Sequence, residues 1–363
     1  MTKIANFLRK RIILSFLLLT FSIIGVGYFL ITGLSDDMLL FVLLSVLIFA
    51  VLYVVFIFLA GEKDIPRLFT VPTTVFLLLT TIIPTLYLLY ISFFDVTLYN
   101  FRKEWPFAGF QNFIRVLGDQ VVQISIIRSI EYVVFSVGIE LILGIIIALL
   151  LDRSFTGKRL LTLILIFPMM MTPIVVGMGW KYFFDLKNGF INCFLENMGL
   201  DIIPWLTSEP LAFASNSPFL VNVLNFKWSF VSMVFVDIWQ WTPFVLIIIL
   251  AGLSTIDRAH IEASMIDGAT YFQRLIYIVL PELKSIIGVV ILIRVMDAIK
   301  AFDTIWALYG NAVATRTLNI SIYTFGMGMN KFGEGAALSL ITLISIIILS
   351  KIFINKFFKA MSS

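Results

Sequence analysis

Four ionisable residues follow one another at steps of three near the end of a long apolar segment: Arg294, Asp297, Lys300 and Asp303. At about 100° per residue, such steps place the side chains in a broad stripe along one side of a helix. An ionisable group at membrane depth costs about 2.5–3.5 kcal/mol on insertion scales, so we expect the stripe to face protein or water. Two uses of the stripe remain open. It can line a polar path, or it can form a salt-bridge network between helices, with Glu140 as a further member.

A second group is formed by Trp239, Gln240 and Trp241, in the outer half of the apolar run 230–253. Aromatic rings can stack on the apolar face of a bound ring while an amide hydrogen-bonds its hydroxyl groups. Tryptophan is also common where a membrane helix meets the lipid headgroups. We expect the interface role for at least one of the two tryptophans.

The composition is that of a protein embedded in lipid. The 363 residues are 60% hydrophobic and 13% charged, with a mean hydropathy of +1.04, whereas soluble domains are about a quarter charged. The basic residues are dispersed, which excludes a nucleic-acid-binding face. The single cysteine, Cys193, excludes an internal disulfide. The single histidine, His260, has no partner at ligand spacing, so we expect no metal site.

Eight apolar runs are long enough to cross a bilayer, which needs about 20 residues per helix. The first run is too long to be a cleaved signal peptide. Pro168, Pro173 and Pro243 lie inside runs and predict kinks. The sequence therefore predicts an all-α polytopic membrane protein with eight transmembrane helices. The runs are 12–33, 38–60, 71–94, 130–151, 160–184, 230–253, 285–308 and 336–357.

The positive charges predict the orientation of these spans. With the N-terminus inside, fifteen Lys and Arg residues fall in cytoplasmic segments and eight in outer segments, although the outer segments are longer. By the positive-inside rule, both termini are then cytoplasmic. The same orientation places residues 254–284 in the cytoplasm and the longer segments 95–129 and 185–229 outside.

Residues 262–281 form a polar, charged segment between two apolar runs. We expect Glu262 at the N-terminal end of a short helix, where the helix dipole stabilises a carboxylate. Gly268 can adopt a positive φ and make a sharp turn between two helices. Pro281 is expected to stop or redirect the second helix before the next span.

The spacing in this segment resembles the coupling motif of ABC importer permeases: Glu-Ala-Ala, three residues, Gly, nine residues and Ile-x-Leu-Pro. Ser264 stands at the third alanine, and Asp267-Gly268-Ala269 is similar to the carbohydrate branch of that family. Residues 107–113 resemble an outer signature of sugar permeases, and the resemblance extends over about 71–357. The residues expected to couple to an ATPase are Glu262, Ala263, Ser264, Asp267, Gly268, Ala269, Leu280 and Pro281.

The resemblance implies the permease subunit of an ATP-driven ABC importer, in a bacterial or archaeal cell membrane. It implies a six-helix core in residues 71–363, with the coupling loop 254–284, and two accessory helices in residues 1–70. The implied cargo is a sugar or polyol delivered by an extracytoplasmic solute-binding protein. The other implied partners are a second related permease and two ATPase subunits.

If the stripe lines a polar path, the polar groups of that path would hydrogen-bond sugar hydroxyls and its tryptophan rings would stack on the sugar. The substrate path then consists of Asp303, Lys300, Asp297, Arg294, Trp239, Gln240 and Trp241. The chain has no Gly-x-x-x-x-Gly-Lys-Ser/Thr loop to hold phosphates. We therefore expect it to be a transport subunit rather than an enzyme. ATP and Mg²⁺ would bind the partner ATPases, and this chain would bind no cofactor.

Two other classes of transporter are the alternatives. An ion-coupled secondary transporter would usually show inverted repeats with broken helices at the membrane midplane, and we find no such internal symmetry. An ABC permease for a non-sugar solute would share the bare coupling motif. Asp267-Gly268-Ala269 and Phe302-Asp303 favour the sugar permeases by their resemblance to that branch.

Overall fold

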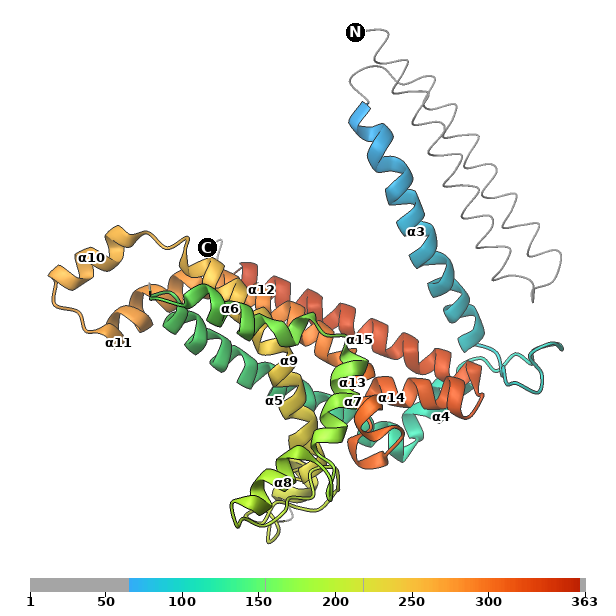
Figure 1. The fold of residues 1–363 in the computed structure, drawn as a ribbon. Helices are drawn as coiled ribbons and strands as arrows, with labels where there is room; N and C mark the ends of the chain where they lie inside the picture. The colour runs from blue at the N-terminus through green and yellow to red at the C-terminus, as the bar shows by residue number, and fades with distance from the viewer. Residues whose placement is uncertain (1–64, 154, 218, 360–363) are drawn as a thin grey trace, which may run out of the picture. The chain divides into compact units, whose positions relative to one another are not determined.

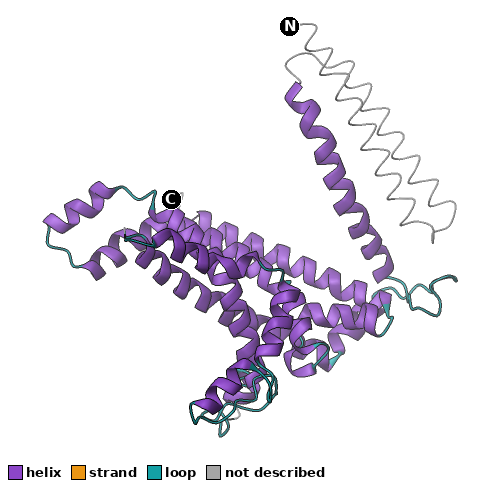
Figure 2. Ribbon diagram, viewed as in Figure 1, coloured by secondary structure: helices purple, strands orange, loops and turns teal. Residues whose placement is uncertain are grey.

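The structure is a computed structural model that describes residues 65–153, 155–217 and 219–359. Every element named in these residues is helical, and the strand-like pairings there are two isolated bridges (Figure 2). The predicted all-α class is confirmed. The apolar runs 12–33 and 38–60 lie outside the described residues.

Four of the described helical stretches are long and apolar enough to cross a membrane, and a bent pair makes a fifth if it counts as one span. The predicted total of eight spans is therefore not confirmed, whereas a multi-pass membrane protein is. The four stretches are α5 (Gln120–Leu151), α9 (Trp228–Leu253), residues Tyr271–Ile299 and the Phe332–Asn355 part of α15 (Phe332–Lys359). The 71–94 run corresponds to α3 (Ile65–Ser92).

Shorter helices complete the described chain (Figure 1). The α-helices are α4 (Gln111–Gly118), α6 (Lys158–Ile166), α7 (Pro173–Phe183), α8 (Phe190–Asn197), α10 (Arg258–Ile266), α11 (Tyr271–Arg274), α12 (Leu280–Ile299), α13 (Asp303–Tyr309) and α14 (Leu318–Tyr323). The 3₁₀ and π turns are η2 (Phe167–Met170), η3 (Phe219–Val223), η4 (Leu275–Val279), η5 (Val313–Thr315) and η6 (Thr324–Gly328).

Residue contacts divide the chain into two units, Met1–Tyr87 and Leu88–Ser363. The boundary falls inside α3, and the second unit contains every element from α4 to α15. The division predicted from the sequence, at residue 70, remains a prediction.

The second unit is built around the pair α5 and α9, which approach closely at Gly144. A Cβ at this position would lie 2.5 Å from Cγ1 of Val245 and 3.2 Å from the backbone nitrogen of Leu246. Small residues permit such approach between membrane helices, where packing acts through van der Waals contact more than through the hydrophobic effect. Leu283 and Val290 of α12 are buried in the same cluster, so three helices meet here.

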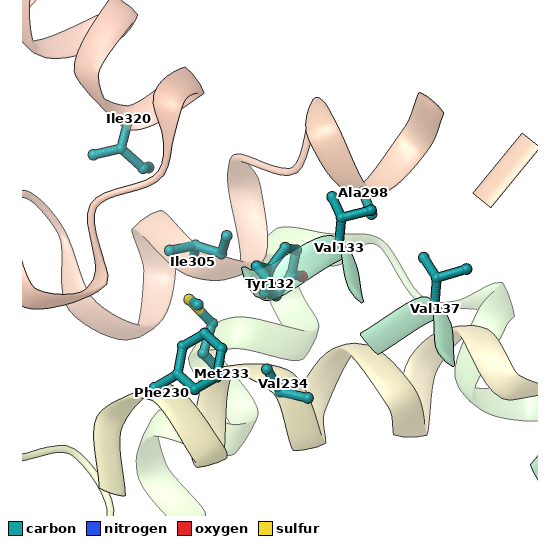
Figure 3. Packing of buried hydrophobic residues seen from close by; sticks show 9 residues of the cluster. All are labelled: Tyr132, Val133, Val137, Phe230, Met233, Val234, Ala298, Ile305 and Ile320. Atoms are coloured by element: carbon teal, nitrogen blue, oxygen red, sulfur yellow. The ribbon is translucent and has the colours of Figure 1, made fainter. Parts of the chain in front are cut away.

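A second buried cluster joins the other ends of α5 and α9 to α13 and α14 (Figure 3). Tyr132 of α5, Met233 of α9 and Ile305 of α13 are each 1% exposed, and Ile320 of α14 is fully buried. The two clusters hold α5 and α9 together along most of their length.

The predicted 160–184 run is broken rather than straight. Residues Lys158–Met170 and Pro173–Phe183 meet at an angle of 99°. Pro168 lies in η2, and Pro173 opens α7, where its missing N–H does no harm. The kink predicted from these two prolines is confirmed. Pro243 lies inside α9, which continues through it, and the kink predicted there remains a prediction.

The predicted 285–308 span is wrong at its end, because α12 stops at Ile299. The backbone N–H groups of Lys300 and Ala301 bond three residues back and close the helix. Phe302 then stacks on Trp306, with 5.6 Å between ring centroids, and contacts Tyr323 at 5.2 Å. Burying this ring turns the chain away from the helix axis, and α13 begins anew at Asp303.

Candidate functional site

The polar segment forms a helical hairpin that projects beyond the ends of α9 and α12 (Figure 1). Its first helix, α10, is capped by Asp257, whose carboxylate accepts the backbone N–H of Ala259 at 2.9 Å. Glu262 therefore lies in the middle of α10 and not at its N-terminal end as predicted. The favourable interaction with the helix dipole belongs to Asp257. The side chain of Glu262 is exposed to solvent.

The turn of the hairpin lies at Gly268, which has a φ of +78° as predicted. Its N–H donates to Met265 O at 3.1 Å, and the N–H of Ala269 donates to Ser264 O at 2.9 Å, which ends α10. No heavy atom would lie within 4 Å of a Cβ at Gly268. The backbone conformation, rather than a lack of space, requires glycine here.

The second arm starts with a capping box. Thr270 Oγ1 accepts the N–H of Gln273, and the Gln273 side chain accepts the N–H of Thr270 at 2.7 Å. From Tyr271 the helix continues to Ile299 without a break. Pro281 therefore does not stop it, contrary to expectation.

The reason lies one turn earlier, in the π-turn η4. There the N–H of Leu280 bonds five residues back, to Leu275 O. The wider turn accommodates the proline ring, which would otherwise clash with a carbonyl four residues earlier. The turn of the hairpin is thereby joined to α12 by one continuous helix.

The hairpin has a concave inner face and an apolar tip. His260 Nδ1 lies 3.1 Å from Glu282 Oε1, which ties α10 to the start of α12. This hydrogen bond raises the pKa of His260 above its ordinary value. Ile266 and Phe272, on either side of the turn, are 88% and 70% exposed. The open concavity has a volume of about 540 Å³ and is lined by His260, Ala263, Ser264, Asp267, Tyr277, Ile278, Pro281 and Glu282.

The structure thus brings Ala263, Ser264, Asp267 and Pro281 to one surface. The other predicted coupling residues lie elsewhere on the hairpin: Glu262 on α10, Gly268 and Ala269 in the turn, and Leu280 at the start of α12.

Deeper in the bundle, Arg294 of α12 is the centre of a buried ion cluster. Its guanidinium donates to both carboxylate oxygens of Glu140 on α5, from Nε at 2.7 Å and from Nη2 at 3.0 Å. Nη2 also donates to Asp237 Oδ2 on α9 at 3.1 Å. The Arg294, Glu140 and Asp237 side chains are 2%, 0% and 6% exposed. Such two-pronged pairing fixes both the position and the plane of the guanidinium.

The predicted stripe therefore has two parts. Arg294 belongs to a buried ion network, whereas Lys300 is exposed. Asp297 links the two parts, 3.8 Å from Arg294 and 3.5 Å from Lys300, whose side chain is 53% exposed. Asp303 is exposed and opens a different helix, α13, where a carboxylate is favourable in the first turn.

The three residues 239–241 point to different surroundings. The Trp241 ring lies 4.9 Å from the Arg294 guanidinium, a cation–π contact that holds the ring beside the ion cluster. Gln240 is buried and donates to Met171 O at 3.1 Å, at the break between η2 and α7. Trp239 packs against Trp180 at 5.3 Å.

Asp237 is not among the residues predicted for the site, although it is the sole charged residue in α9. A single carboxylate in an apolar run is a strong signal by itself, because an unpaired charge at that depth is costly. Its partner could not be read from spacing, since Arg294 lies 57 residues away. Within the described residues, no three His, Cys, Asp or Glu side chains are placed to hold a metal ion.

Known proteins resemble this chain in sequence and in fold. The probable ABC transporter permease protein y4oQ of Sinorhizobium fredii is 31% identical over 81% of this chain and 90% of its own length. The trehalose/maltose transport system permease protein MalF of Thermococcus litoralis is 29% identical over 81% of this chain and 94% of its own length. A chain in the crystal structure of a bacterial ABC transporter involved in alginate import superposes with a TM-score of 0.68. It is 19% identical, and the match covers 82% of this chain and 96% of that one.

The family described as binding-protein-dependent transport system inner membrane component matches residues 140–362. This range includes the hairpin, the ion cluster and all the helices from α6 onward. The chain therefore belongs to the family of binding-protein-dependent transport system inner membrane components, the permease subunits of ABC transporters.

Proposed function

We propose that the chain moves a sugar into the cell as one of two related permease subunits of an ABC importer. A solute-binding protein outside the membrane delivers the sugar, and two ATPase subunits inside supply the energy. The trehalose/maltose permease of T. litoralis and the trehalose permease SugA of Mycobacterium tuberculosis, 26% identical over 82% of this chain, support a sugar as the cargo. ATP and Mg²⁺ bind the ATPases in this proposal.

The observation that carries the proposal is the joining of the exposed hairpin to the buried ion cluster by one helix. The stretch Tyr271–Ile299 starts beside the turn at Gly268 and contains Arg294. A helix is stiff over such a length, so displacement of its first turns is passed to Arg294. The apolar tip residues Ile266 and Phe272 offer an ATPase a surface that water would otherwise cover.

The ion cluster supports a role as the fixed point of this movement. Arg294 binds carboxylates from α5 and α9 at once, so a shift of α12 reaches both helices. We place ATPase docking at Glu262, Ala263, Ser264, Asp267, Gly268, Ala269, Leu280 and Pro281. Among these, Glu262 is a free carboxylate on the exposed side of α10, suited to a basic residue of the ATPase.

The substrate path is proposed to run past the accessible end of the stripe. Trp241, held in place by Arg294, offers a ring face, while Asp297 and Lys300 offer an acceptor and donors for hydroxyl groups. Asp303 follows at the start of α13. Arg294, Trp239 and Gln240 are packed or buried, and we assign them to positioning these groups.

The proposed orientation places the hairpin and both termini in the cytoplasm. Figure 1 shows the end of α15 on the side of the unit from which α10 and α11 project, which supports a cytoplasmic C-terminus. The localisation is the cell membrane of a bacterium or archaeon.

Transport by the reconstituted complex tests this function. The chain is co-expressed with its partner permease, ATPases and binding protein, and uptake of radiolabelled trehalose and maltose into vesicles is measured. We expect uptake of at least one of them to require both internal ATP and the binding protein. Sugar uptake without ATP, driven by an imposed proton or sodium gradient, would contradict the proposal. ATP-dependent uptake of a non-sugar solute, with no uptake of sugar, would overturn the proposal that the cargo is a sugar.

A further inference from the structure

The short helix α8 presents an apolar face that no described residue covers. Phe190 and Phe194 are 68% and 56% exposed, and Met198, just beyond the helix, is 61% exposed. These residues recur every four positions, so they share one side of the helix. A group of large exposed apolar side chains normally marks a contact surface.

The helix cannot rotate this face inward, because Asn192 on another side of it is locked in place. Asn192 is 1% exposed. Its Nδ2 donates to Ile203 O at 3.0 Å, and its Oδ1 accepts the N–H of Ile203 and Nε1–H of Trp205, both at 3.1 Å. The exposed face is therefore a fixed feature of the fold.

A chain of tryptophan contacts links α8 to a candidate span. The Trp205 ring, bound to Asn192, lies 5.3 Å from the ring of Trp228. Trp228 is the first residue of the span Trp228–Leu253. Tryptophan gathers where spans meet the headgroups. The helix α8 is thus tied through Trp205 to the first residue of α9, at the end of a candidate span.

The apolar face of α8 also continues an exposed face of α7, one arm of the bent pair that is apolar enough to make a fifth span. On α7, part of the broken span, Val175, Met178 and Tyr182 are 50%, 61% and 66% exposed. At the end of α7, the Phe183 ring contacts the Phe190 ring at 6.3 Å. One exposed apolar strip therefore runs from α7 onto α8.

We propose that α8 is an interfacial helix that lies in the surface of the lipid bilayer where α9 begins. Phe190, Phe194 and Met198 enter the boundary between headgroups and acyl chains, as in other amphipathic interfacial helices. Glu196 lies about 200° around the helix from Phe194 and is exposed to water. The continuity with α7 selects lipid as the partner, because the same surface covers both helices.

The native cysteine makes a direct test available. Cys193 is the one cysteine of the chain, is exposed, and lies between Phe194 and Glu196 around the α8 axis. Three full-length chains carry a nitroxide label: the native chain at Cys193, and Cys193→Ser chains with Phe194→Cys or with Glu196→Cys. Each is reconstituted in vesicles of phosphatidylethanolamine and phosphatidylglycerol.

Collision rates of the label with oxygen, which enters lipid, and with a water-soluble nickel chelate are then compared. We expect the oxygen-to-nickel ratio to fall in the order 194, 193, 196, with a several-fold difference between the first and the last. Phe190→Cys, on the same face as Phe194, repeats the test if Phe194→Cys fails to insert.

Two results would overturn the proposal. Equal access of nickel to labels at 194 and 196 would place the face in water. Low access of both reagents to the label at 194 would mean that protein covers this face, either the chain itself or a second copy of it. The test does not involve the cargo or the ATPases, so its failure would leave the proposed transport function untouched.

Discussion

The Nε of Arg294 lies 2.7 Å from Oε2 of Glu140, although 154 residues separate them in the chain. Asp237 adds a second carboxylate at 3.1 Å. One guanidinium thus joins α5, α9 and α12 at a buried point. Because the helical stretch Tyr271–Ile299 runs from the hairpin to this cluster, the proposed movement of the hairpin would reach α5 and α9 through Arg294.

Replacing Arg294 with Met should strongly destabilise the fold. The change leaves the carboxylates of Glu140 and Asp237 buried without a cation, and breaking a buried pair in this way costs about 3–5 kcal/mol. The thermal unfolding midpoint of the purified chain in detergent measures the loss. The matched control is Lys300→Met, which breaks a half-exposed pair worth under about 1 kcal/mol. Similar midpoints for the two variants would show that the cluster does not stabilise the bundle.

Substitutions at Gly268 should act through the backbone. A non-glycine residue with positive φ costs about 1–2 kcal/mol, more for a β-branched one and less for asparagine. Gly268→Val should therefore reduce the amount of ATPase that co-purifies with the chain, while Gly268→Asn retains most of it. Since a Cβ there meets no neighbour, steric crowding predicts no difference between them. If both variants retain the same amount of ATPase, the turn at Gly268 does not contribute to docking.

The contact between the two arms of the hairpin can be monitored by titrating His260, the single histidine of the chain. The hydrogen bond to Glu282 raises the pKa of His260, so the protonated form is favoured in the folded hairpin. The contact between α10 and α12 is then fully present below the ordinary histidine pKa of about 6.5 and is lost as pH rises through the raised value. In NMR of histidine-labelled protein, the His260 resonance should titrate with a midpoint above that value. In the Glu282→Gln variant, the midpoint should fall back toward the ordinary histidine pKa. An unchanged midpoint in the variant would exclude the contact.

Asp303→Asn should weaken substrate handling without disturbing assembly. The residue is exposed at the start of α13, and the change removes a charge but preserves shape. We expect a higher sugar concentration for half-maximal uptake, with unchanged maximal ATP hydrolysis. Glu104→Gln, in the outer segment 95–129, serves as the control. A raised basal hydrolysis in Asp303→Asn would instead assign the residue to a gate.

Short sequence patterns predict the turns and bends whose cause is local. They do not predict features that depend on contacts between residues far apart in the chain. The positive φ of Gly268 and the bend at Pro168 and Pro173 follow from the chemistry of those residues. The end of α12 does not follow from local chemistry, because it depends on Phe302 packing against Tyr323, which belongs to a later helix.

The candidate sites show the same division. Glu262 was placed at a helix end because the true cap, Asp257, lies outside the recognised motif. The sequence predicts that Pro281 stops or redirects the second helix, because the π-turn before it cannot be read from residue types. The partnership of Glu140 with Arg294 was considered, whereas the contribution of Asp237 depends on how three helices pack.

The hairpin is proposed to couple ATP hydrolysis to transport, and one rate tests this coupling most directly. ATP hydrolysis by the full reconstituted complex is measured with and without the sugar-loaded binding protein, for the native chain, Glu262→Ala and Glu196→Ala. Both carboxylates are exposed, but Glu196 is on α8, remote from the hairpin in the fold (Figure 1). We predict that Glu262→Ala loses most of the stimulation by the loaded binding protein and that Glu196→Ala keeps it. Full stimulation in Glu262→Ala would contradict the coupling role of the hairpin.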